Sequence, residues 1–129
     1  MSAEIKKATQ GFNEPLPAGI HWFKKTPDQL LQPNTTYEDG VAEGVVAFYW
    51  LCSWEKSYLD AVGKSDKKAA ASSLAQLGKW ESLPFAQSSI SDPDHGWEKA
   101  ILTPAKQGDP TAMRSSFDSD CLVYTANNP

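Results

Sequence analysis

Glu55 and His95 are the side chains of this sequence best suited to acid–base chemistry. Glu55 follows Cys52 by three residues and falls on the inward face of an expected helix, where burial raises the pKa of an unpaired carboxyl. Histidine titrates close to neutral pH and serves as a general acid or base in many enzymes. The alternative for Glu55 is structural: it would pair with Arg114, the only arginine, or accept a hydrogen bond from a tryptophan indole.

Motifs for nucleophilic and phosphate chemistry do not accompany these residues. The sequence contains no G-x-S-x-G elbow, no glycine-rich phosphate loop and no H-E-x-x-H pair. A transition-metal site would need the two histidines, His21 and His95, to meet a carboxylate or thiolate in the fold. We therefore expect no cofactor, no metal and no catalytic residue, and Glu55 with His95 is the pair that a small enzyme would use.

Cys52 and Cys121 are the only cysteines, and two interpretations fit them. No C-x-x-C spacing is present, so neither a thioredoxin-like motif nor a zinc ribbon applies. Both could be buried reduced thiols of a cytosolic protein. We favour a disulfide between them, because one lies in the centre of an expected helix and the other near the C-terminus. Closing so long a loop contributes about 4 kcal/mol in the chain-entropy model, and a disulfide implies an oxidising compartment.

The composition excludes several classes of partner. The chain has 129 residues and a net charge of −4, with lysines scattered among acidic residues. Nucleic-acid binders present a basic face, so we expect no nucleic-acid partner. We also expect no membrane insertion, because the apolar run over residues 45–54 is much shorter than the roughly 20 residues that a span needs. No secretory h-region opens the chain. We expect one soluble domain, either complete or cut from a longer protein.

Helical periodicity runs through most of the chain, whereas sustained alternation of the β-strand kind is missing. A long central helix is predicted to start from a cap at Thr35 or Thr36 and to end near Gly63. It is apolar on almost every side, so it should be buried on every side. About three shorter helices should pack around it, one of them capped by Ser65. The predicted fold class is all-α.

Prolines and glycines divide the chain into three parts. Residues 1–36 should form an extended N-terminal arm packed on the domain, because their prolines prevent a long helix. Within it, residues 1–11 should be either a short helix or a frayed lead-in. Ile20, Trp22 and Phe23 should anchor this arm. Residues 37–121 should form the helical domain, and residues 122–129 a loose polar tail.

Aromatic residues that the core does not need could supply a binding surface. Five tryptophans are many for this length, and large aromatics dominate small cores and binding hot spots alike. An exposed patch of them would mark an interaction site. We identify Trp22, Tyr37, Trp80 and Trp97 as the possible binding surface.

Three stretches stand out together: the aromatic run over residues 48–55, the segment 74–77 with Trp80, and Gly108-Asp109-Pro110 before Asp120-Cys121. In this combination the chain resembles a group of uncharacterised small exported or membrane-anchored helical proteins of high-GC Gram-positive bacteria. The similarity covers about residues 40–121. It implies an extracytoplasmic location and transfers no catalytic residue.

The function expected from these observations is a non-enzymatic, extracytoplasmic helical domain that binds a protein or a small ligand. Two alternatives stand beside it. One is a small enzyme in which Glu55, or Asp94, works with His95 as acid and base. The other is a cytosolic accessory or immunity-type protein that binds one partner. The sequence leaves the partner and the oligomeric state open.

Overall fold

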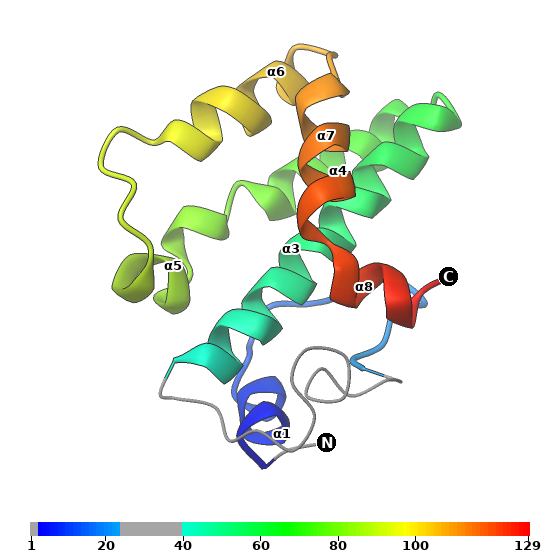
Figure 1. Ribbon diagram of the computed structural model, residues 1–129. Coiled ribbons are helices and arrows are strands. Elements are labelled where there is room, and N and C mark those ends of the chain that lie inside the picture. Colours follow the sequence, from blue (N-terminus) through cyan, green and yellow to red (C-terminus); the bar gives the residue numbers. More distant parts are fainter. Residues whose placement is uncertain (1–2, 24–39) are drawn as a thin grey trace.

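The computed structural model describes residues 3–23 and 40–129, and this part of the chain is helical without strands, which confirms the predicted all-α class. The longer elements are α1 (Ala3–Gln10), α3 (Val41–Gly63), α4 (Lys67–Leu77) and α7 (Thr111–Asp120). The short ones are η1 (Trp80–Ser82), α5 (Pro84–Ser89), η2 (Glu98–Leu102), α6 (Thr103–Lys106) and α8 (Leu122–Asn127). Figure 1 shows α3 running through the molecule with the other helices arranged around it.

Helix α3 is 23 residues long and forms the centre of the fold. Its sides are covered by α1, α4, α5, α7 and α8, each of which packs against it. Trp50 and Ala47 are fully buried, in a cluster with Leu77 of α4 and Met113 of α7. A second cluster joins the N-terminal half of α3 to the two ends of the chain. Elements from both halves of the sequence therefore bury most of this helix, but Val41 and Phe48 stay 42% and 41% exposed, so the predicted burial on every side holds only in part.

The ends of α3 and α4 follow local backbone rules. Helix α3 begins after Gly40, whose φ of 90° suits a glycine, and Thr35 and Thr36 lie outside the described residues. It ends at Gly63 as predicted. Asp66 caps α4 by accepting a hydrogen bond from the Ala69 amide at 3.0 Å. The expected cap at Ser65 is wrong by one residue, because Ser65 adopts a left-handed turn with φ 54°.

Residues 3–23 of the expected arm lie against α3, and their first part forms α1, the short helix that was one of the two possibilities for residues 1–11. Ile5 of α1 is fully buried. The Pro15 carbonyl accepts the indole N–H of Trp50 at 2.8 Å and that of Trp54 at 2.9 Å. One carbonyl of the N-terminal segment is thus held by side chains from two successive turns of α3. Residues 24–36 of the arm lie outside the described residues.

The tail over residues 122–129, expected to be loose, contains helix α8 and is packed. Tyr124 is 4% exposed and its ring lies 5.2 Å from that of Tyr49. Asn128 Nδ2 donates to the Tyr49 hydroxyl at 3.1 Å. The prediction was wrong because it relied on the mostly polar composition of the tail and gave no weight to Tyr124. The burial of this aromatic side chain offsets the entropy cost of ordering the chain end.

Leu77→Ala should destabilise the protein by about 2–5 kcal/mol, because Leu77 is fully buried and its removal leaves a cavity in the core. Leu122→Ala, the same change at a side chain that is 71% exposed, should cost less than about 0.5 kcal/mol. Urea unfolding followed by circular dichroism measures both. Equal losses for the two variants would contradict the assignment of the core.

Candidate functional site

A disulfide ties the middle of α3 to the junction of α7 and α8. The sulfurs of Cys52 and Cys121 are joined at 2.05 Å, their Cα atoms are 5.7 Å apart, and the two residues are 69 positions apart in the sequence. Both residues are 2% exposed. The structure thus adopts the disulfide, which was one of the two interpretations of the cysteines.

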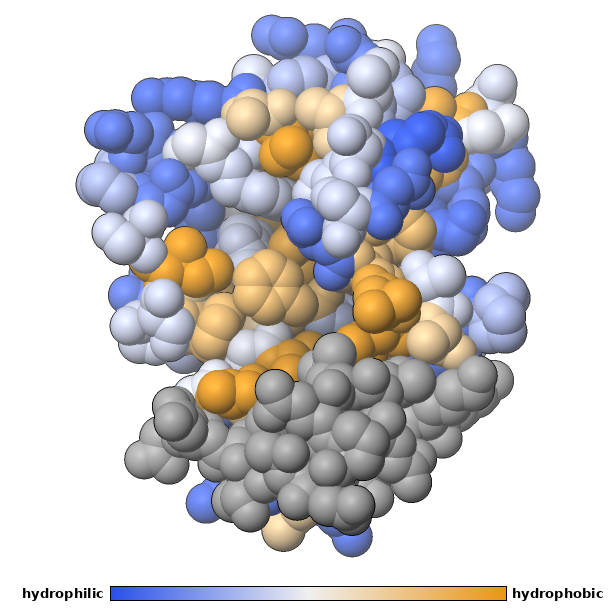
Figure 2. Space-filling view, viewed as in Figure 1, coloured by the Kyte–Doolittle hydropathy of each residue, from blue (hydrophilic) through white to orange (hydrophobic). Residues whose placement is uncertain are grey.

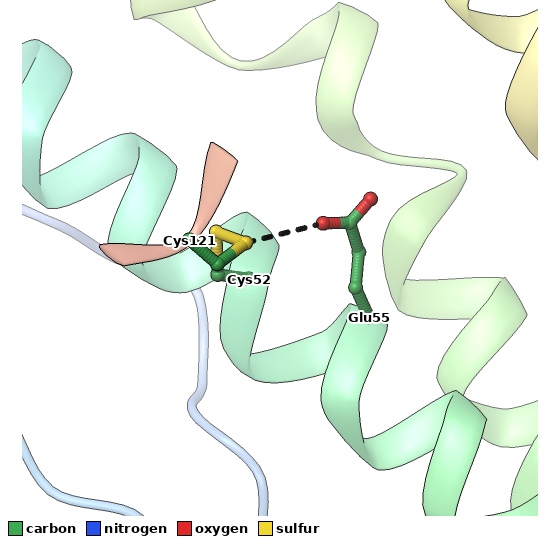
Figure 3. Close-up of side chains that lie close together, drawn as sticks. All are labelled: Cys52, Glu55 and Cys121. Atoms are coloured by element: carbon green, nitrogen blue, oxygen red, sulfur yellow. Dashed lines mark hydrogen bonds between the residues drawn. A yellow bond between two sulfur atoms is a disulfide. The ribbon is translucent and has the colours of Figure 1, made fainter. Parts of the chain in front are cut away.

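Glu55 lies beside this disulfide, one turn further along α3, and is 1% exposed. Figure 3 shows its carboxyl directed at the sulfur pair, with Oε1 3.6 Å from Cys121 Sγ. A disulfide sulfur carries no hydrogen, so across this contact only a protonated carboxyl can donate. The other oxygen, Oε2, is buried and has no hydrogen-bond partner among the residues that the structure describes. Unsatisfied buried oxygens are rare in folded proteins.

Burial, followed by the charge of Asp120, raises the pKa of Glu55 from its ordinary value of 4.5 to about 8. The carboxyl is therefore mostly neutral at pH 7. Neither expected structural partner holds it. The indoles of Trp50 and Trp54 donate to Pro15 instead, and Arg114 is exposed and forms no ion pair with Glu55 in the described part of the chain.

His95 is remote from this chemistry. Its side chain is 61% exposed and its Nδ1 lies 2.7 Å from Glu81 Oε2. The hydrogen bond with Glu81, together with the charge of that carboxylate, raises the pKa of His95. Glu55 and His95 thus have different partners, and the structure does not assemble the acid–base pair that a small enzyme would need.

A cluster around His95 has the residue types of a metal site. One ligand atom each from Glu81, His95 and Glu98 lies within 4.8 Å of the others. Two of its members already form an exposed ion pair, and such pairs are common on protein surfaces without a metal. The same distance criterion groups Cys52, Glu55 and Cys121, but sulfurs joined in a disulfide are not the thiolates that a metal requires.

Ser53 and Lys56 have the S-x-x-K spacing of some serine hydrolases, a match that motif reading could have found. In the structure the Ser53 hydroxyl donates to the Trp50 carbonyl at 2.6 Å. Lys56 pairs with Asp60 at 2.9 Å, one turn further along α3. The two side chains are occupied with separate partners, and the spacing reflects helix periodicity.

The structure places three of the four aromatic residues proposed as a binding surface, and one of them, Trp80, is buried. Trp80 is 4% exposed and packs on Phe48 with ring centroids 5.1 Å apart, so its assignment to the surface is corrected. Trp22 and Trp97 are half-buried against the core clusters, and Tyr37 lies outside the described residues. The core of so small a domain needs these rings, which is why few remain for the surface.

The large hydrophobic side chains that the described part of the chain does expose are Val41, Phe48 and Leu122, at 42%, 41% and 71%. Phe48 and Leu122 border a cavity of about 270 Å³, which we call the disulfide hollow. Its lining consists of Gly44, Val45, Phe48, Tyr49 and Cys52 from α3 and of residues 120–124. Figure 2 shows hydrophobic surface across the middle of the face that carries α3, α7 and α8. The sequence analysis did not predict this surface, because it depends on the packing of α8 beside α3, two segments that are far apart in the sequence.

A second cavity, of about 420 Å³, lies among α1, α3 and α5. Phe12, Val46 and Phe85 give it an apolar lining, and its volume is within the usual range of ligand pockets. Its charged lining residues include Lys7 and Glu43, which are exposed. Glu14, also in the lining, is half-buried and pairs with Lys79 at 3.0 Å. None of the charged lining residues that the structure describes is fully buried.

Comparison with known proteins gives no relative: no protein-family model, curated protein or solved structure matches this chain. Among the residues that the structure describes, no helix has the length and apolarity to cross a membrane.

Glu55→Gln should stabilise the protein increasingly as the pH rises. The folded state keeps the Glu55 proton up to a pKa of about 8, whereas the unfolded chain releases it above 4.5. The folded state binds more protons in this window, so wild-type stability falls with rising pH by roughly 1 kcal/mol per unit. Glutamine has a similar shape and cannot ionise. Urea unfolding between pH 4 and pH 9 should show equal stabilities near pH 4 and a growing advantage of the variant up to about pH 8.

Glu43→Gln is the matched control, since Glu43 lies on the same helix and is exposed. Its stability should stay within about 0.5 kcal/mol of the wild type across this range. A Glu55→Gln variant with the same pH dependence as the wild type would show that Glu55 ionises normally in the fold.

Proposed function

We propose that this protein is a non-enzymatic binding module that works outside the cytoplasm and docks a segment of a partner protein in the disulfide hollow. The observation that carries the proposal is that exposed Phe48 and Leu122 border one cavity, with exposed Val41 about two turns before Phe48 on the same helix. Contiguous exposed apolar surface on a small domain marks an interaction site more often than isolated hydrophobic residues do.

Packing beneath the surface favours a binding role over incidental exposure. The Phe48 ring contacts Trp80 and Phe85, with centroids 5.1 and 5.9 Å away. Gly44 leaves room for this arrangement, because a Cβ there would lie 3.0 Å from the Phe85 ring. A side chain held in one position loses little entropy on binding, so the docking surface is preorganised.

Charge selects the chemistry of the partner segment. Asp120 lines the disulfide hollow and is exposed, and the chain carries a net charge of −4. A segment with large apolar side chains flanked by lysine or arginine would match both the cavity and its rim. Such complementarity contributes mainly to specificity and association rate.

The disulfide supports the extracytoplasmic part of the proposal, since cytosolic reductants keep most thiols reduced. The resemblance to exported proteins agrees with this location. A cytosolic accessory or immunity-type protein would use the same surface for one partner, but its cysteines would remain thiols. The enzyme alternative is weaker, because Glu55 and His95 are held by separate partners.

A synthetic amphipathic helix of leucine and lysine should bind the protein. Leu122→Ser should raise the dissociation constant for this peptide about ten-fold. The loss of one exposed leucine contact is of the order of 1.4 kcal/mol. Thr125→Ala is the control, because Thr125 is exposed on the same helix and does not line the disulfide hollow. Tryptophan fluorescence or calorimetry measures the binding.

A leucine–glutamate peptide of the same length tests the charge argument and should bind more weakly than the leucine–lysine peptide. Equal affinity of wild type and Leu122→Ser for the leucine–lysine peptide would overturn the docking surface.

A further inference from the structure

We propose that the Cys52–Cys121 disulfide is a redox-active centre. It exchanges with a small thiol that enters through the disulfide hollow, and Glu55 gives its proton to the departing sulfur of Cys121. This thiol–disulfide exchange goes beyond partner binding, and it stands on the geometry of the Cys52–Glu55–Cys121 cluster.

The proposed route to the sulfurs is the disulfide hollow at the surface. Both cysteines belong to the lining of the disulfide hollow, which has about 270 Å³ of space. Their exposure of 2% each means that the opening admits a small reagent rather than a protein surface. A low-molecular-weight monothiol or dithiol is therefore the class of reactant that fits.

The position of Glu55 assigns the roles of the two sulfurs. Its Oε1 lies 3.6 Å from Cys121 Sγ, so Cys121 is the sulfur that can be protonated as it leaves. Cys52 Sγ is then the sulfur that the entering thiolate attacks. A thiolate is a poor product in apolar surroundings, and exchange is faster when the leaving sulfur is the better leaving group. Proton transfer from an adjacent carboxyl removes this difficulty.

The exchange balances in two steps. In the first, a thiolate sulfur forms a bond to Cys52 Sγ, the Cys52–Cys121 bond breaks, and its electron pair stays on Cys121 Sγ, which takes the Glu55 proton. In the second, another thiolate attacks the sulfur of the first reactant in the mixed disulfide and releases Cys52 as a thiolate. Solvent protons, lost by the two thiols, restore Cys52 and Glu55. Two thiols are oxidised to one disulfide, and the protein disulfide is reduced to two thiols.

The surroundings keep Glu55 ready to donate. It is buried, and within residues 3–23 and 40–129 its Oε2 has no hydrogen-bond partner. Burial, together with the charge of Asp120 on α7, raises its pKa to about 8 and keeps the carboxyl mostly neutral at pH 7. The other titratable groups at the hollow are Tyr49 of α3 and Tyr124 of α8. Burial raises the pKa of both, that of Tyr124 to about 12, so neither ionises in the range where Glu55 does.

A purely structural disulfide does not require this carboxyl. An unpaired polar atom in the core lowers the stability of the fold, and a leucine or glutamine would fill the same space without ionising. A proton donor in contact with a sulfur is, however, what exchange at a buried disulfide needs.

The test is the rate at which dithiothreitol reduces the folded protein between pH 6 and pH 9, with new thiols counted by alkylation and mass spectrometry. The rate should rise linearly with dithiothreitol and exceed the unfolding rate. The normalised rate, which is the reduction rate divided by the concentration of dithiothreitol thiolate, should fall above about pH 8 as Glu55 loses its proton. In Glu55→Gln the normalised rate should be at least about ten-fold lower at pH 7 and independent of pH. Glu43→Gln should behave as the wild type.

Two results would overturn the proposal. A reduction rate that reaches a plateau at the unfolding rate would show that thiols attack only the unfolded chain. A Glu55→Gln profile that superimposes on that of the wild type would show that the carboxyl transfers no proton to Cys121. Urea unfolding of each variant checks that it is folded under the conditions of the assay.

Discussion

The structure depends on one constraint, which is that most of the apolar surface of α3 must be buried. This helix of 23 residues is apolar around nearly its whole circumference, and a 129-residue chain has few elements with which to bury it. Helices from both termini are therefore drawn onto it. Ile5 of α1 and Tyr124 of α8 meet in one cluster with Tyr49 and Cys52 of α3, while α4 and α7 cover the other side. The packed state of both chain ends follows from this demand.

The disulfide and Glu55 act on the same region with opposite effects on stability. The Cys52–Cys121 bond closes a long loop and restricts the unfolded chain. Beside it, a carboxyl with an unpaired oxygen lowers the stability of the folded chain as the pH rises. The stability that the disulfide contributes offsets the stability that the buried carboxyl costs. A domain of this size can therefore keep an acidic group in its core.

Sequence patterns predicted the features that depend on neighbours along the chain. The all-α class, the end of the central helix at Gly63 and the burial of Glu55 follow from helix periodicity and local stop signals. Features that depend on contacts between residues far apart in the sequence could not be predicted in this way. The indoles of Trp50 and Trp54 bond to the Pro15 carbonyl, more than thirty positions away, so their partner could not be read from α3. Trp80 was assigned to the surface because its burial depends on Phe48 and Phe85. The resemblance to exported bacterial proteins stays a prediction.

Both functional proposals depend on the disulfide, because it positions α8, borders the disulfide hollow and contacts Glu55, the candidate proton donor. Its presence in the native protein is therefore the central claim. The direct measurement is peptide mapping by mass spectrometry of protein isolated without reductant, with free thiols alkylated at the moment of lysis. The account predicts a linked Cys52–Cys121 peptide as the main species. Alkylation of both cysteines throughout the sample would contradict it.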